Sequence, residues 1–103
     1  MSEIVTVNPA SGAQLERFNY MTAAEIDTHL DAARAAFLNW RRERLETRGN
    51  LLKAIAGLLR SNRDRLAEIA VKEMGKPIVQ ARAEVEKCAW ACEHFANCGA
   101  EYL

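Results

Sequence analysis

The spacing of the apolar residues is the feature that most constrains the fold of this 103-residue chain. From residue 26 to residue 95 they recur at steps of three and four, the period of an amphipathic α-helix. Signals for helix ends divide this stretch, so we expect about four helices, each packed through one apolar face. The apolar faces consist of Ile26, Leu30, Ala33, Phe37 and Trp40 in the first helix, Leu51, Leu52, Ile55, Leu58 and Leu59 in the second, and Ile78, Ala81, Val85, Cys88, Cys92 and Phe95 in the fourth. In the third helix, Leu66, Ile69, Ala70 and Met74 are predicted to face inward.

The amino-terminal region has a different pattern. Residues 4–7 are mostly β-branched, residues 8–12 are rich in turn formers, and residues 13–20 alternate in polarity. This order predicts a β-hairpin over 4–20, which must rest on another element because two strands alone are marginally stable in water. A capping box formed by Thr22 and Glu25 then begins the first helix, within a helical region 22–103.

The middle helices are bounded by further signals. A run of arginines that starts at Arg41 ends the first helix, and the second spans about 46–61. Gly49 and Gly57 lie inside this second helix, where each costs about 1 kcal/mol relative to Ala. We expect both glycines to allow close packing against a neighbouring helix. Asn62 is predicted to cap the third helix.

The last helix has a clear beginning but no stop signal. Gly75 ends the helix before it as a left-handed residue, and Pro77 serves as the first residue of the fourth. If that helix reaches Leu103 it is roughly 40 Å long at 1.5 Å per residue. The chain then closes on two bulky apolar residues, whereas natural ends are more often polar and frayed. We therefore expect residues 1–103 to be one incomplete segment of a longer protein.

The charges exclude some partners. The chain has 14 basic and 14 acidic residues, so no overall field attracts nucleic acid or an anionic membrane. Residues 41–65 hold eight bases and three acids. Two interpretations are open: a stripe that binds polyanions, or a solvated helix face that meets acidic neighbours. No aromatic residue lies between Arg41 and Arg65 for base stacking, which favours the second interpretation.

Location and thiol state follow from what the sequence contains. The amino terminus lacks the basic and apolar regions of a signal peptide, and no apolar run approaches the ~20 residues of a membrane span. Three cysteines, an odd number, fall on one predicted helix. We expect free thiols in a reducing cytoplasm.

One cluster resembles a metal site, namely Cys88, Cys92, His94 and Cys98. Four ligands on one helix cannot surround a tetrahedral zinc ion, and cysteines in an apolar stripe pack as small hydrophobic residues. The glycines are too far apart for a phosphate-binding loop. We therefore predict no catalytic, cofactor-binding or metal-binding residue in this chain.

Several of these motifs, in this order and spacing, resemble the start of the aldehyde dehydrogenase superfamily. The stretch 73–90 and the short lead before the hairpin are most similar to the succinate-semialdehyde dehydrogenase branch. The residues that carry the resemblance are Asn8-Pro9-Ala10-Ser11-Gly12, the Ala-rich run from Ala32 to Trp40, Arg48, Leu51, Leu52, Ile55, Leu59, Leu66-Ala67, Glu73-Met74-Gly75-Lys76-Pro77, Ala81 and Glu84-Val85.

The resemblance implies a much longer enzyme of α/β fold, in which residues 1–103 are part of the cofactor-binding domain. Such enzymes oxidise an aldehyde through a thiohemiacetal on a Cys, pass hydride to NAD or NADP, and assemble as homo-oligomers. An Asn and a backbone amide stabilise the developing oxyanion. The resemblance puts all of these groups after Leu103, so the segment alone should bind no cofactor and be inactive.

The resemblance also places the fourth helix beside the substrate entrance, with Ala83, Lys87 and Trp90 facing it. Lys87 would then attract an aldehyde that carries a carboxylate. The alternative is a solvated Lys87 paired with Glu84, because exposed ion pairs of this kind are common and weak.

Two other accounts of the whole chain stay open. It could be a stand-alone helical module that dimerises through the apolar face from Ile78 to Phe95, or a polyanion binder that uses residues 41–65.

Overall fold

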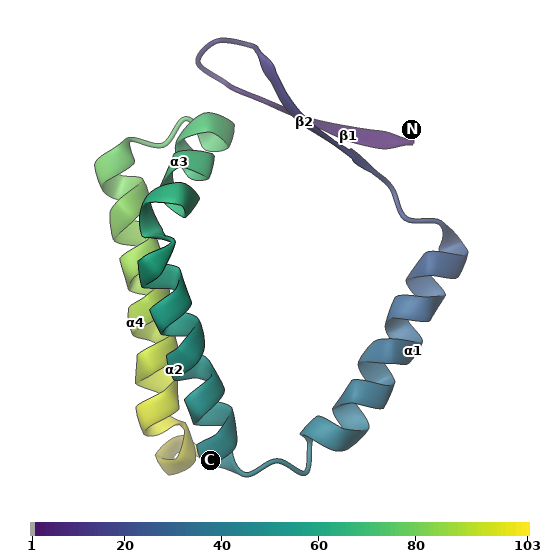
Figure 1. The fold of residues 1–103 in the computed structure, drawn as a ribbon, viewed down its shortest axis with the longest axis vertical. Helices are drawn as coiled ribbons and strands as arrows, with labels where there is room; N and C mark the ends of the chain where they lie inside the picture. Colours follow the sequence, from purple (N-terminus) through teal and green to yellow (C-terminus); the bar gives the residue numbers. More distant parts are fainter. Residues whose placement is uncertain (1) are drawn as a thin grey trace.

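A computed structural model describes residues 2–103 (Figure 1). These residues form an antiparallel two-stranded hairpin followed by helices, which confirms the predicted fold class. The elements are β1 (Glu3–Val7), β2 (Gln14–Asn19), α1 (Ala23–Trp40), α2 (Leu45–Ser61), α3 (Arg63–Met74) and α4 (Ile78–Tyr102).

The elements do not close into one compact body. Helices α2, α3 and α4 lie together, whereas α1 stands apart on the other side of the molecule (Figure 1). The radius of gyration is 17.8 Å, against about 13 Å expected for a compact chain of this length. None of the residues of α1 is buried. The described chain therefore has a packed half and an uncovered helix.

The predicted helix ends are mostly confirmed. Thr22 and Glu25 form a complete capping box: the Thr22 hydroxyl oxygen accepts from the Glu25 amide at 3.2 Å, and the Glu25 carboxylate accepts from the Thr22 amide at 2.8 Å. Gly75 has a φ of +68° and ends α3 in the left-handed conformation that favours glycine.

Two predicted ends are wrong in detail. The Asn62 side chain donates to the carbonyl oxygen of Leu58 at 2.8 Å, so it closes α2 and makes no side-chain cap for α3. Pro77 has a ψ of 138°, which is extended, and the helix begins one residue later at Ile78. An Asn at a junction between two helices can bond to either helix, and here its side-chain amide donates to a free carbonyl of the preceding helix.

Close approach explains one of the two helical glycines. A Cβ added at Gly49 would lie 3.1 Å from the backbone carbonyl oxygen of Ala96 in α4, so the predicted close packing is confirmed there. For Gly57 it is wrong: this residue is exposed, and a Cβ there would meet nothing within 4 Å.

The apolar stripe of α1 is not covered within residues 2–103: its apolar side chains are exposed, and Leu30 reaches 63%. Leu51, Leu58, Ile69 and Met74 are exposed as well. The buried positions are instead small residues, namely Gly49, Ala56, Ala67, Ala81 and Ala89.

Helix α4 is rotated relative to the prediction. Ala81 lies in the buried face as predicted, but Ala89 takes the place expected for larger side chains, and Cys88 and Phe95 are exposed. The expectation of a packed Cys88 sulfur is therefore wrong. Small side chains let two helix backbones approach closely, so the large apolar residues flank the contact.

The hairpin rests on α3 near its turn. The ring of Pro9 lies 3.1 Å from the point where a Cβ on Gly75 would stand. Leu15 of β2 and Ile69 of α3 line the same small hollow. The need for support beneath the hairpin is thus confirmed. Among residues 2–103, no helix combines the length and apolarity that crossing a membrane requires.

Candidate functional site

The outer face of α4 carries a shallow hollow of about 690 Å³. Of the three predicted entrance residues, Ala83 and Lys87 line this hollow. Trp90 does not line it; its side chain is 61% exposed and lies near the ring of His94. The lining residues are Lys76, Gln80, Ala83, Glu84, Lys87, Cys88 and Ala91.

The charges around this hollow differ from one of the two sequence alternatives. Glu84 forms its ion pair with Lys76, which precedes the helix. The predicted pair between Lys87 and Glu84 is therefore wrong. Within residues 2–103, no carboxylate lies within 4.0 Å of the Lys87 ammonium nitrogen. The hollow thus contains two lysines and one glutamate, which leaves one positive charge without a local partner.

Sequence reasoning missed Lys76 and Cys88 at this hollow. Lys76 lies in the connection before α4, where no helical period applies, so its contact with Glu84 eight residues later follows only from the path of the chain. Cys88 is adjacent to Lys87 and exposed, but the apolar stripe had placed it in the interior.

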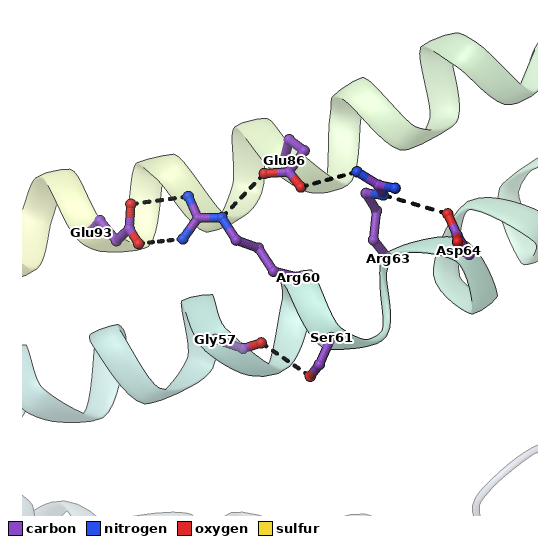
Figure 2. Close-up of polar contacts among 7 residues, drawn as sticks. All are labelled: Gly57, Arg60, Ser61, Arg63, Asp64, Glu86 and Glu93. Carbon is purple, nitrogen blue, oxygen red and sulfur yellow. Dashed lines mark hydrogen bonds and ion pairs between the residues drawn. The ribbon is translucent and has the colours of Figure 1, made fainter.

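The basic stretch of the middle helices is engaged by acids of α4 (Figure 2). Arg60 bonds to Glu86 at 3.1 Å and to both carboxylate oxygens of Glu93. Arg63 lies 3.5 Å from Glu86 and 3.4 Å from Asp64. Hydrogen bonds from Arg60 hold the pKa of the Glu93 carboxyl below its ordinary value and raise the pKa of Arg60. These contacts support the solvated face over the polyanion stripe.

A small polar cluster lies on the last turns of α4. The Tyr102 hydroxyl is 3.1 Å from Nε2 of His94, and a hydrogen bond with Cys98 raises the pKa of Tyr102. The cluster holds a thiol, an imidazole and a phenol on one helix. In the part of the chain that the structure describes, no group of three or more His, Cys, Asp or Glu is placed to hold a metal ion. Among residues 2–103, no carboxylate bonds to His94, whereas a nucleophilic site needs a group that orients its base.

Among the described residues, no glycine lies in a phosphate-binding turn between a strand and a helix. Gly12 and Gly75 are the described glycines with positive φ, one in the hairpin turn and one between two helices. A phosphate cradle needs a glycine-rich turn that leaves a strand and opens a helix. Neither glycine has that position, so we assign no NAD(P) contact to residues 2–103.

The fold and the sequence together identify the class of protein. Residues 1–103 match the family model described as the aldehyde dehydrogenase family, and the chain belongs to this family. A succinic semialdehyde dehydrogenase from Streptococcus pyogenes, solved in complex with NADP+, superimposes with a TM-score of 0.90 at 35% identity. That match covers 96% of this chain and 22% of the Streptococcus chain.

Two sequence relatives carry similar names. The succinate semialdehyde dehydrogenase of Escherichia coli, named with NAD(P)+, is 38% identical over 99 residues, covering 96% of this chain and 21% of the relative. A probable NADP+ succinate-semialdehyde dehydrogenase of Synechocystis is 39% identical over 100 residues, covering 97% and 22%. The chain thus spans about a fifth of the length of the curated relatives it matches.

Proposed function

We propose that this chain acts as the amino-terminal segment of an NAD(P)-dependent aldehyde dehydrogenase that oxidises succinate semialdehyde to succinate. One observation carries the proposal: nearly the whole chain matches relatives with that name at 38% and 39% identity, while it covers about a fifth of each. The full protein would act on a small aldehyde in the reducing cytoplasm as a homo-oligomer, and the three free thiols fit that compartment.

In this proposal the segment belongs to the cofactor-binding domain and supplies no reacting group. The thiohemiacetal forms on a Cys outside residues 1–103, and NAD(P)+ is held by other parts of the polypeptide. What supports this division is that, among the described residues, there is no phosphate cradle and no carboxylate bonded to His94. The exposed apolar face of α1 is then a surface that the remainder of the protein covers.

The first test is the coding sequence beyond Leu103, together with activity. An open frame that continues to a Gly-Gln-x-Cys nucleophile supports the proposal, and the full-length product should then reduce NAD(P)+ in the presence of succinate semialdehyde. The 103-residue chain alone should show no turnover. A stop codon directly after Leu103, with clean dimerisation of the purified chain, would favour the stand-alone helical module instead.

We further propose that Ala83, Lys87 and Trp90 face the substrate entrance and that Lys87 attracts the substrate carboxylate. The unpaired Lys87 ammonium beside the hollow supports this role, because Glu84 forms its ion pair with Lys76 and not with Lys87. Ala83 lines the same hollow, whereas Trp90 would stand at its rim.

Replacement of Lys87 in the full-length enzyme tests this role. We expect Lys87→Met to lower the preference for succinate semialdehyde over an uncharged aldehyde of equal length by about 1.4- to fivefold, since one exposed charge contributes roughly 0.2–1 kcal/mol. The measurement is the ratio of the two kcat/KM values. Lys53→Met, on α2 and away from the hollow, is the matched control. An unchanged ratio in Lys87→Met would end the hypothesis.

A further inference from the structure

The Arg48 side chain joins the end of α1 to the start of α2. It lies in the first turn of α2, and its Nη2 donates to the carbonyl oxygens of Trp40 at 3.3 Å and Arg41 at 2.9 Å. These carbonyls stand at the carboxyl end of α1, which carries partial negative charge, and the Trp40 oxygen also accepts from the Glu43 amide at 3.0 Å. The Arg48 guanidinium therefore adds a hydrogen-bond donor at the Arg41 oxygen and complements the partial charge.

We infer that Arg48 is a clamp that fixes the direction of α1 relative to the α2–α4 pair, and therefore the direction in which α1 presents its apolar face. The clamp itself is a property of the described residues. Only the identity of the surface that meets this face, the remainder of the polypeptide, rests on the proposed function.

The direction of α1 needs such a clamp because packing does not fix it. No residue of α1 is buried, and the helix stands away from α2, α3 and α4 (Figure 1). The chain enters α1 from the hairpin and leaves it through the short connection 41–44. Backbone hydrogen bonds order this connection, and Arg48 is the side chain that joins the end of α1 directly to α2.

The α2 end of the clamp is held firmly. Gly49, the next residue, is buried against the backbone of Ala96 in α4. The Nε of Arg48 is enclosed and has no hydrogen-bond partner among residues 2–103, while the residue as a whole is half-buried. Arg48 also borders an apolar hollow of about 480 Å³ between the start of α2 and the end of α4. A continuous set of contacts therefore runs from α4 through Gly49 and Arg48 to the end of α1.

The neighbouring arginines do not share this contact. The Arg41 guanidinium lies over the ring of Phe37, 5.8 Å from the ring centre, so it is turned back along α1. Arg44 precedes α2 as its N-cap and makes no side-chain cap hydrogen bond. Arg44 thus offers a matched control: an arginine of the same connection with the same charge and without the clamp geometry.

The experiment compares Arg48→Met, Arg48→Lys and the control Arg44→Met in the 103-residue chain. Amide hydrogen exchange is followed by mass spectrometry for residues 37–47, and for residues 50–60 and 84–96 as internal references. We expect Arg48→Met to speed exchange of 37–47 by about tenfold, the loss that corresponds to a hydrogen bond from a charged donor. The reference segments and Arg44→Met should stay unchanged. Arg48→Lys keeps the charge without the planar fork and should give a smaller increase.

A second measurement reads the direction of α1 itself. Spin labels at Asp31 in α1 and Lys53 in α2, in a variant whose three cysteines are replaced by Ala, should give a distance distribution that is clearly broader in Arg48→Met. Unchanged exchange together with an unchanged distribution would overturn the clamp. Faster exchange in all three segments for both Arg48 variants would also overturn it, since Arg48 would then act on folding in general. The same holds if residues 37–47 show no protection in the unmodified chain.

Discussion

The two glycines of α2 can each be replaced by Ala, one at an exposed position and one packed against α4. At Gly57, which is exposed, an added methyl meets nothing within 4 Å, so Gly57→Ala gains helix propensity alone. We expect it to raise the free energy of unfolding by about 0.5–1 kcal/mol. At Gly49 the methyl would lie 3.1 Å from the Ala96 carbonyl oxygen and 3.7 Å from its Cα. A helical backbone cannot rotate this oxygen away, so α2 and α4 must separate slightly.

That separation is costly because the rest of the contact is equally close. Ala56 and Ala89, which belong to the same two helices, are both 0% exposed. Overpacking of a tight core costs typically about 1–3 kcal/mol, which exceeds the propensity gain of about 1 kcal/mol. Gly49→Ala should therefore leave the free energy of unfolding unchanged or lower it by up to about 2 kcal/mol.

Urea unfolding of the two variants and the unmodified chain, followed by far-UV circular dichroism, measures this difference. The two variants should differ by about 1–3 kcal/mol, because the local propensity gain is common to both and only the contact with α4 differs. Equal stabilisation by Gly49→Ala and Gly57→Ala would refute the close approach of α2 and α4. A lower midpoint for Gly57→Ala would refute the claim that this position is free of contacts.

Other predictions concern the polar contacts. Thr22→Ala should weaken α1 by about 1 kcal/mol, seen as lower helix content, because it removes the N-cap. Hydrogen bonds from Thr22 lower the pKa of the Glu25 carboxyl, so the cap should stabilise α1 fully above the ordinary glutamate pKa and fail as the pH falls through the lowered value; in a circular dichroism titration this acid step should vanish in Glu25→Gln. Arg60→Met and Glu93→Gln should each destabilise the chain, with the double variant losing less than the sum; additive losses would contradict the pairing of Figure 2.

The helix ends could be predicted because their chemistry is local. The Thr22 hydroxyl reaches an amide three residues away, and Gly75 adopts a left-handed φ that other residues disfavour. Such contacts depend on neighbours in sequence, which a reading of the sequence contains. Asn62 marks the limit of this reasoning, since it had helical neighbours on both sides and bonded to the preceding one.

The contacts between elements could not be predicted in the same way. Helical periodicity identifies an apolar face, but it does not say which face meets which helix. In α4 the buried positions are Ala81 and Ala89, so the exposed Cys88 was misplaced by a fraction of a turn. The clamp by Arg48 and the Lys76–Glu84 pair join residues seven or eight positions apart across a helix end, where the period of 3.6 residues no longer applies.

The substrate-entrance residues remain a prediction for a related reason. Ala83 and Lys87 line one hollow because they are one helical turn apart, which the sequence already implies. Whether an aldehyde passes there depends on elements that lie across from α4. The free charge of Lys87 is what the structure adds, since it follows from Lys76 and could not be derived from the helix alone.

The helices differ in how far their apolar faces and polar groups find partners within the described chain. Helices α2 and α4 contact each other through buried alanines. Ion pairs of Arg60 with Glu86 and Glu93 also join them, so these two helices have both apolar and polar partners within the chain. Helix α1 has its polar end groups satisfied, by the capping box at one end and by Arg48 at the other. Its apolar face has no such partner.

The stabilisation that covering this apolar face would add follows from the exposed fractions of its side chains. Full burial of a large apolar side chain stabilises a protein by about 1.5–3 kcal/mol. Ile26, Leu30, Phe37 and Trp40 are each between 42% and 63% exposed, so covering all four would add roughly 3–6 kcal/mol. That is comparable with the whole stability of a small domain. Because α1 is correctly capped and clamped but lacks this term, its secondary structure is set by residues 2–103, while its stability depends on whatever surface covers the face.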